Sequence, residues 1–255
     1  MSEHWILDAA AKTEPAHGCV PDERSIEQLL SAAVILLDKP AGPSSHQLAA
    51  WAKELMGLEK MGHGGTLDPF ATGVLPLMLG KTMRLTGAML GQQKCYIAVM
   101  RFSEAPGADE LASATAALQG LIYNVPPEIS AVKVQVRTRT VSAFEVLDID
   151  GRFVVMKIEC EAGTYIRTIA RDLGLLLAQE IELVELRRTA SGIFNERHCV
   201  TMETIADAFW LWQTKSDEAA LRKILLPIET LVEAFPQVFV KDGAVGALSH
   251  GAPLA

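Results

Sequence analysis

Apolar residues recur along the chain in two patterns, one typical of strands and one typical of helices. Alternating or short continuous apolar runs predict strands at residues 34–37, 96–101, 132–138, 141–149, 152–161 and 183–194. Helical spacing predicts helices at residues 44–57, 108–118, 164–177, 201–212 and 217–225, and the apolar stretch between Pro69 and Gly80 is also helix-like. No regular repeat of strand, helix and parallel strand is present. The pattern predicts an α+β fold with a mixed, largely antiparallel sheet flanked by helices.

Capping residues and the end of the chain indicate how these elements are bounded and grouped. Ser44 or Ser45 can cap the first predicted helix and Thr164 the third, because their hydroxyl oxygens can accept hydrogen bonds from free backbone N–H groups. Residues 236–255 begin β-like after a proline, but about 20 residues cannot form a domain alone. We therefore expect one folding unit over residues 1–235 and the start of a second over 236–255.

Composition narrows the class of protein. The chain has 255 residues, of which 49% are hydrophobic and 21% charged, and this balance excludes a disordered chain. The longest apolar stretch, residues 32–37, is far shorter than the roughly 18 to 20 residues that span a bilayer, and no leader opens the chain. A cytoplasmic protein without membrane contact is expected. The four cysteines form no C-x-x-C pair and the histidines no H-E-x-x-H motif, so we expect buried thiols and no metal or other cofactor.

The charge distribution allows two interpretations. The net charge of −8 argues against general nucleic-acid binding. Residues 81–101, however, contain basic side chains and no acidic ones, and Lys133, Arg137 and Arg139 recur in a second segment without acids. Such local stripes can attract phosphate, but on charge alone solvated strand and helix faces explain them better.

Two catalytic motifs can be excluded. Residues 80–82 (GKT) resemble the end of a phosphate-binding P-loop, but Leu75 stands where that motif requires glycine. Ser44 and Ser45 lie outside any G-x-S-x-G sequence, so a serine hydrolase is not indicated either.

The loop at residues 62–69 (GHGGTLDP) is the most informative segment. Its three glycines allow a ligand to approach the backbone closely, and Pro69 favours an extended conformation for Asp68. Asp68 either closes a turn by bonding its own backbone or is a carboxylate available as nucleophile or base.

The second informative segment is residues 163–168 (GTYIRT), where a strand gives way to a helix. Arg167 lies in the first helical turn, where a positive charge opposes the helix dipole. A carboxylate or phosphate partner explains this position better than local stability does, and Asp68 is the obvious partner. The alternative is a surface ion pair that contributes under about 1 kcal/mol.

These segments resemble the successive motifs of the TruB/dyskerin family of RNA pseudouridine synthases, in family order along residues 34–194. The matching segments are 39–44 (KPAGPS), 62–75 (GHGGTLDPFATGVL), 94–96 (KCY), 163–167 (GTYIR) and 186–192 (LRRTASG). Further segments resemble the archaeal-type catalytic subunit of box H/ACA particles, namely 21–28 (PDERSIEQ), 126–133 (PPEISAVK), 137–140 (RTRT), 160–163 (CEAG) and 240–245 (VKDGAV).

The resemblance implies a pseudouridine synthase fold over residues 1–235, with 236–255 as the start of an incomplete PUA-like domain. One departure is Gly64, where the family usually has Ser or Thr, which predicts a looser loop.

The resemblance also implies roles for individual residues. Asp68 is the expected catalytic carboxylate, acting as nucleophile or base, and Arg167 is expected to pair with it. Tyr96 is expected to stack on the extruded uracil and is a candidate to receive its C5 proton, while Tyr165 helps to position or deprotonate the base. The residues expected to support or wall the substrate site are Lys39, His63 and Leu186. Those expected to meet RNA phosphate are Lys133, Arg137, Arg187 and Arg188.

The expected activity is isomerisation of uridine to pseudouridine in tRNA, in guide-directed rRNA, or in both, with small accessory proteins as further partners. A non-catalytic RNA-binding subunit of a box H/ACA-type particle is the alternative. A glycoside hydrolase is a third reading, but such enzymes need a second carboxylate, and no acidic residue lies within eight positions of Asp68.

Overall fold

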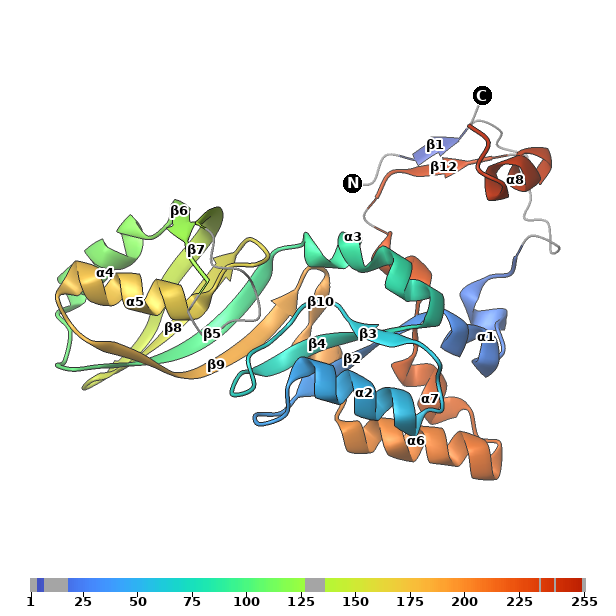
Figure 1. Ribbon diagram of the computed structural model, residues 1–255, viewed down its shortest axis with the longest axis horizontal. Helices are drawn as coiled ribbons and strands as arrows, with labels where there is room; N and C mark the ends of the chain where they lie inside the picture. Colours follow the sequence, from blue (N-terminus) through green and yellow to red (C-terminus); the bar gives the residue numbers. More distant parts are fainter. Residues whose placement is uncertain (1–3, 7–17, 127–135, 234, 241, 254–255) are drawn as a thin grey trace.

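A computed structural model describes residues 4–6, 18–126, 136–233, 235–240 and 242–253 (Figure 1). Its centre is a ten-stranded sheet in the order β11-β2-β4-β9-β5-β8-β7-β6, with β3 paired to β4 and β10 to β9. The strands are β2 (Ala33–Lys39), β3 (Met61–His63), β4 (Thr72–Leu79), β5 (Lys94–Phe102), β6 (Gly120–Asn124), β7 (Arg137–Asp150), β8 (Phe153–Cys160), β9 (Ile181–Ser191), β10 (Phe194–Asn195) and β11 (Leu226–Pro227). Only the β4–β9 pair among these strands is parallel, which confirms the expected fold class.

Helices cover the sheet in two groups (Figure 1). The first group consists of α1 (Ile26–Ser31), α2 (Ser45–Leu55), α6 (Met202–Lys215) and α7 (Ala219–Ile224). The second consists of α4 (Ala108–Ala117) and α5 (Ile166–Leu177), which lie against strands β5 to β9. Short helical segments complete the body: η2 (Pro21–Glu23), η3 (Gly80–Leu85), α3 (Thr86–Leu90), η4 (Glu196–His198) and η5 (Ile228–Leu231).

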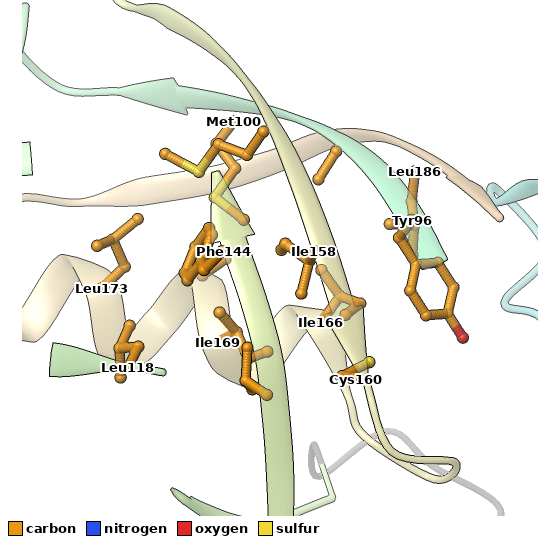
Figure 2. Packing of buried hydrophobic residues seen from close by; sticks show 14 of the residues in the cluster. Tyr96, Met100, Leu118, Phe144, Ile158, Cys160, Ile166, Ile169, Leu173 and Leu186 are labelled. Atoms are coloured by element: carbon orange, nitrogen blue, oxygen red, sulfur yellow. The ribbon is translucent and has the colours of Figure 1, made fainter. Parts of the chain in front are cut away.

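The buried side chains divide this body into two lobes. The first lobe, residues 26–90 and 194–232, has one apolar cluster between β2, β4 and the first group of helices, and a smaller one that includes Met89 of α3 and Leu231 of η5. The second lobe, residues 94–191, has a cluster between α4, α5 and strands β5 to β9 (Figure 2), which Leu67 and Ala71 of the first lobe join at its edge. Side chains alternate along β5, and α5 buries Ile166, Ile169 and Leu173, as their spacing predicts.

Two expected elements differ from the structure. The apolar stretch before Gly80 is the strand β4 and not a helix, because β4 is buried on both faces and therefore lacks the alternation that identifies a half-buried strand. Thr164 does not cap α5: Tyr165 occupies the N-cap position, and the Thr164 hydroxyl donates to the Glu161 carbonyl. Ser44 caps α2 as expected.

The two ends of the chain meet away from the main sheet (Figure 1). Strand β1 (His4–Ile6) pairs in parallel with β12 (Gln237–Phe239), which is followed by α8 (Asp242–Ser249). The expected division at residue 236 therefore separates β1 from β12, its neighbour in a two-stranded sheet. Within the described ranges, no helix has both the length and the apolar character needed to cross a membrane.

All four cysteines are free thiols, but only Cys160 is fully buried. The expectation of four buried thiols is thus wrong for the other three, which are half-buried. Burial raises the pKa of the Cys160 thiol to about 12, so it is inert at neutral pH.

Candidate active site

Asp68 and Arg167 meet at the boundary between the lobes. Asp68 lies on the loop between β3 and β4, and Arg167 is the second residue of α5. The Arg167 Nη2 atom donates to Asp68 Oδ1 over 2.9 Å, with side-chain exposures of 30% for Arg167 and 32% for Asp68. The position of Arg167 in the first turn of a helix predicted this contact with Asp68, and the contact is present. Both side chains remain accessible to solvent.

A buried lysine holds the loop from beneath. The Lys39 ammonium is fully buried and donates to the carbonyls of Pro40 at 2.8 Å, Pro69 at 2.9 Å and Ala71 at 2.8 Å. Burial lowers the pKa of Lys39, and the nearby Asp68 carboxylate opposes this effect. Lys39 therefore supports the loop, as expected, and because it is fully buried it does not itself touch a substrate.

Ser45 and Arg188 fix the same loop at further points. The Ser45 hydroxyl accepts from the Leu67 N–H at 2.9 Å and donates to the Leu67 carbonyl at 3.2 Å. Arg188 on β9 donates to the carbonyls of Val74 at 2.8 Å and Gly65 at 3.1 Å. Arg188 is only 1% exposed, so the expected contact with RNA phosphate is wrong: the strand turns this side chain inward to the loop.

Arg187, which is expected to meet RNA phosphate, is half-buried and binds carboxylates of the protein. Its Nη1 and Nη2 atoms donate to the two carboxylate oxygens of Asp38 at 3.0 and 3.1 Å, and Nε donates to Glu196 at 2.7 Å. These hydrogen bonds, first of all those to Asp38, raise the pKa of Arg187. Its guanidinium is thus occupied by two carboxylates of the protein itself.

Two further residues, Arg137 and Lys133, are expected to meet RNA phosphate. Arg137 is the first residue of β7 and is exposed, as a phosphate contact must be. Lys133 lies outside the described residues.

Apolar side chains from both lobes form a cluster that includes Leu67 and Ile166, the residues that precede the two members of the ion pair in the chain. Tyr96 on β5 and Leu186 on β9 are buried side chains of this cluster. Figure 2 shows Tyr96 beside Leu186, with its hydroxyl directed away from the aliphatic side chains. Burial raises the pKa of Tyr96, so its neutral phenol is the resting form.

Tyr165 is held by a residue that sequence reasoning missed. Asn124, at the end of β6, is buried; its Oδ1 atom accepts from the Tyr165 N–H at 2.8 Å and its Nδ2 atom donates to the Tyr165 carbonyl at 3.3 Å. Tyr165 itself is half-buried at the start of α5. The sequence could not reveal this contact, because an asparagine at a strand end is common and its partner, Tyr165, lies 41 positions away.

His63 lies at the end of β3 and contacts a second histidine. Its ring meets His46 edge-on, with 4.6 Å between the ring centroids. Burial lowers the pKa of His63, and its Nδ1 atom is buried without a hydrogen-bond partner among the described residues. His63 is therefore a neutral ring beside the loop at pH 7.

Replacing Gly64 by Ser is expected to change the free energy of unfolding by less than about 1 kcal/mol. A Cβ atom at this position lies 3.4 Å from Met89 Cε and Pro76 Cβ, which is ordinary van der Waals contact. The loop is held by the side chains described above, so the glycine does not by itself make it loose. Urea unfolding of both proteins measures the difference, and a loss of several kcal/mol contradicts this packing.

Lys94 predicts a pH dependence of stability. It is buried at the start of β5, donates to the carbonyls of Met89 at 3.2 Å and Gln92 at 2.9 Å, and burial lowers its pKa to about 8. In the unfolded chain a lysine releases its proton near about pH 10.4, so between these values the unfolded state binds more protons and stability rises with pH.

The Lys94→Met variant isolates this contribution. The unfolding free energy of the natural protein minus that of the variant is expected to be larger at about pH 9.5 than at about pH 7. Urea unfolding at both pH values measures it. A difference that stays constant or falls with pH contradicts the burial of a titrating lysine.

Two large cavities lie away from Asp68. One of about 670 Å³ is lined by residues of α1 and η3, among them Leu30 and Met83. The other, of about 1150 Å³, lies at the far end of β5 and β9 and includes Arg101 and Arg152. Neither is lined by residues of the Asp68 loop.

Comparisons with known proteins cover nearly the whole chain. Residues 53–166 match the family model of the TruB family pseudouridylate synthase N-terminal domain, and residues 167–233 match the tRNA pseudouridylate synthase B C-terminal domain. Residues 2–49 match the DKCLD domain.

Similar curated proteins are longer than this chain. The probable tRNA pseudouridine synthase B of Pyrobaculum aerophilum is 43% identical over 243 residues, which is 95% of this chain and 73% of that protein. The protein of the same name from Methanothermobacter thermautotrophicus is 42% identical over 255 residues, 100% of this chain and 79% of the relative.

Two solved structures are similar over almost all of the chain. The crystal structure of a Cbf5-Nop10-Gar1 complex contains a chain with 43% identity and a TM-score of 0.90, covering 97% of this chain and 75% of that one. The structure of an H/ACA RNP bound to a substrate RNA containing 2′-deoxyuridine contains a chain with 40% identity and a TM-score of 0.90, covering 98% of this chain and 76% of that one.

Proposed function

The chain belongs to the TruB family of pseudouridylate synthases, and we propose that Asp68 is the carboxylate with which it isomerises uridine to pseudouridine in RNA. The observation that carries this proposal is the ion pair of Asp68 with Arg167 on a partly exposed loop. RNA is a polyanion, so a protein that only binds RNA does not need an acidic side chain at the binding site. The presence of the Asp68 carboxylate therefore indicates a chemical role.

The reaction needs no group beyond those of the chain. The bond between C1′ and N1 of uridine breaks, the uracil turns, and a bond from C1′ to C5 forms, while C5 loses its proton and N1 gains one. A single carboxylate serves either by attacking C1′ or by taking a proton from the sugar. Arg167 orients Oδ1, and among the described residues no hydrogen bond reaches Oδ2, which leaves that oxygen for the reaction.

The apolar side chains suit a base that has left its stack. A flipped uridine loses stacking worth a few kcal/mol, and an aromatic ring beside the carboxylate can replace part of it. Tyr96 supplies this ring and Leu186 the adjoining wall. Because burial raises the pKa of Tyr96, the ring is better suited to stacking than to removing the C5 proton.

The RNA substrate and the partners follow from the names of the relatives. Similar proteins are named tRNA pseudouridine synthase B, and similar chains occur in an H/ACA RNP and in a complex with Nop10 and Gar1. The substrate of this chain is accordingly tRNA, guide-directed rRNA, or both, with small accessory proteins as partners. Exposed Arg137 is the described candidate for contact with the RNA backbone.

The pairing of β1 with β12 suggests a second, small RNA-binding unit. Strands β1 and β12 with α8 form a small unit beside the main sheet, and this unit corresponds to the start of a PUA-like RNA-binding domain.

Incubation with labelled RNA tests the function. The purified chain is mixed with uridine-labelled tRNA or rRNA, with and without guide RNA and accessory proteins, and the products are mapped. Pseudouridine at a defined position is expected in at least one mixture. RNA binding without pseudouridine in every mixture indicates a non-catalytic subunit and contradicts the proposal.

A further inference from the structure

The two lobes share very little backbone pairing. Strands β4 and β9 join them in parallel through two residue pairs, Thr72 with Arg187 and Gly73 with Arg188, and the short strand β10 pairs with the end of β9 through two more. By contrast, β5 and β9 within the second lobe are paired along their whole length. Among the described residues, the apolar cluster of the second lobe reaches the first lobe only through Leu67 and Ala71, so neither a long ladder nor an extended shared core fixes the angle between the lobes.

The catalytic groups are divided between these lobes. Asp68 belongs to the first lobe, whereas Arg167, Tyr96 and Leu186 belong to the second. A change in the angle between the lobes therefore alters the distance from the carboxylate to the groups that orient it and to the base that it serves. Displacements of about 1 Å at reacting groups can cost about a hundredfold in rate.

Arg187 joins the lobes beside this junction. It extends from β9 of the second lobe, while Asp38 on β2 and Glu196 in η4 belong to the first. Nη1 and Nη2 bind Asp38 at 3.0 and 3.1 Å as a fork, and Nε binds Glu196 at 2.7 Å. The planar guanidinium thereby ties one strand to two separate elements of the other lobe with defined directions.

We propose that Arg187 is a positioning residue: by holding Asp38 and Glu196 it sets the orientation of the two lobes, and with it the approach of Asp68 to Arg167. This inference rests on the proposed role of Asp68. The neighbouring Arg188 complements it, because Arg188 holds the loop itself through the carbonyls of Gly65 and Val74.

Single-turnover kinetics of Arg187→Gln and Arg187→Lys test the proposal. We expect the rate of pseudouridine formation to fall about 10- to 100-fold in Arg187→Gln. The RNA dissociation constant and its salt dependence are expected to stay unchanged. Arg187→Lys is expected to recover only part of the rate, because an ammonium is a point charge and cannot form the fork. A residue that contacts phosphate behaves in the opposite way, with weaker binding, a smaller salt slope and an unchanged rate.

Two controls separate positioning from a loss of folding. Arg101→Gln removes another arginine–glutamate pair, with Glu182, that lies within the second lobe and is exposed; its rate is expected to equal that of the natural protein. In the double variant Arg187→Gln/Arg167→Lys, the fold-loss of the single-turnover rate is expected to be smaller than the product of the two single fold-losses. Both substitutions disturb the same feature, the placement of Arg167 against Asp68. Should Arg187→Gln fail to fold, Asp38→Asn, which leaves Glu196 bound, carries the same test.

The outcomes distinguish this inference from the proposed function. An unchanged rate in folded Arg187→Gln, or independent effects in the double variant, overturns the positioning role while leaving the role of Asp68 intact. Full activity of Asp68→Asn overturns the proposed role of Asp68 itself.

Discussion

Replacing Asp68 by Asn is expected to abolish pseudouridine formation while leaving the fold and RNA affinity nearly unchanged. The amide has almost the same shape as the carboxylate and its oxygen can still accept from Arg167, but it is neither a nucleophile nor a base. The ion pair is partly exposed, so its loss costs under about 1 kcal/mol of stability. Removal of a negative charge does not weaken binding to a polyanion.

The matched control for this variant is Asp172→Asn. Asp172 also forms an ion pair with an arginine, Arg171. Both residues of this pair lie on α5, so the pair does not join the two lobes. We expect a fall in the single-turnover rate of at least about a thousandfold for Asp68→Asn and none for Asp172→Asn. Undiminished turnover of Asp68→Asn removes Asp68 from the mechanism.

Replacing Gly73 by Ala is expected to lower the free energy of unfolding by about 3 kcal/mol or more. Gly73 has a φ of +100°, and a Cβ atom there lies 2.2 Å from the Arg188 carbonyl oxygen. That oxygen belongs to the backbone of β9, so relief of the contact requires the two strands to separate at the junction of the lobes. We therefore expect loss of activity together with loss of stability.

Gly57→Ala provides the comparison for Gly73→Ala. Gly57 also has a left-handed φ, of +60°, but a Cβ atom there meets nothing within 4 Å. This variant therefore measures backbone strain alone, about 1 to 2 kcal/mol. Urea unfolding compares the two proteins, and equal losses contradict the close approach of β4 and β9.

The parts of the fold that sequence predicts are those with one buried face. Helix α5 and strand β5 each expose one side to solvent, so their apolar residues repeat with the period of the element. Strand β4 is covered on both faces, and its continuous apolar run is equally compatible with a buried helix. Periodicity is informative only where burial is one-sided.

The site shows a similar division. The contact of Arg167 with Asp68, 99 positions apart, could be predicted because an arginine in a first helical turn needs a partner, and the family motifs name both residues. Nothing in the sequence tells which way Arg187 and Arg188 face, since adjacent strand residues point to opposite sides. Both were expected to meet phosphate; Arg188 is buried against the loop, and Arg187 binds Asp38 and Glu196.

The most direct measurement of the central claim uses RNA whose uridines carry tritium at C5. Because the new glycosidic bond forms at C5, each pseudouridine releases one tritium to water. We expect tritium release equal to the pseudouridine formed, no free uracil, and no release by Asp68→Asn. Free uracil with abasic RNA, or continued tritium release by Asp68→Asn, contradicts isomerisation by this carboxylate.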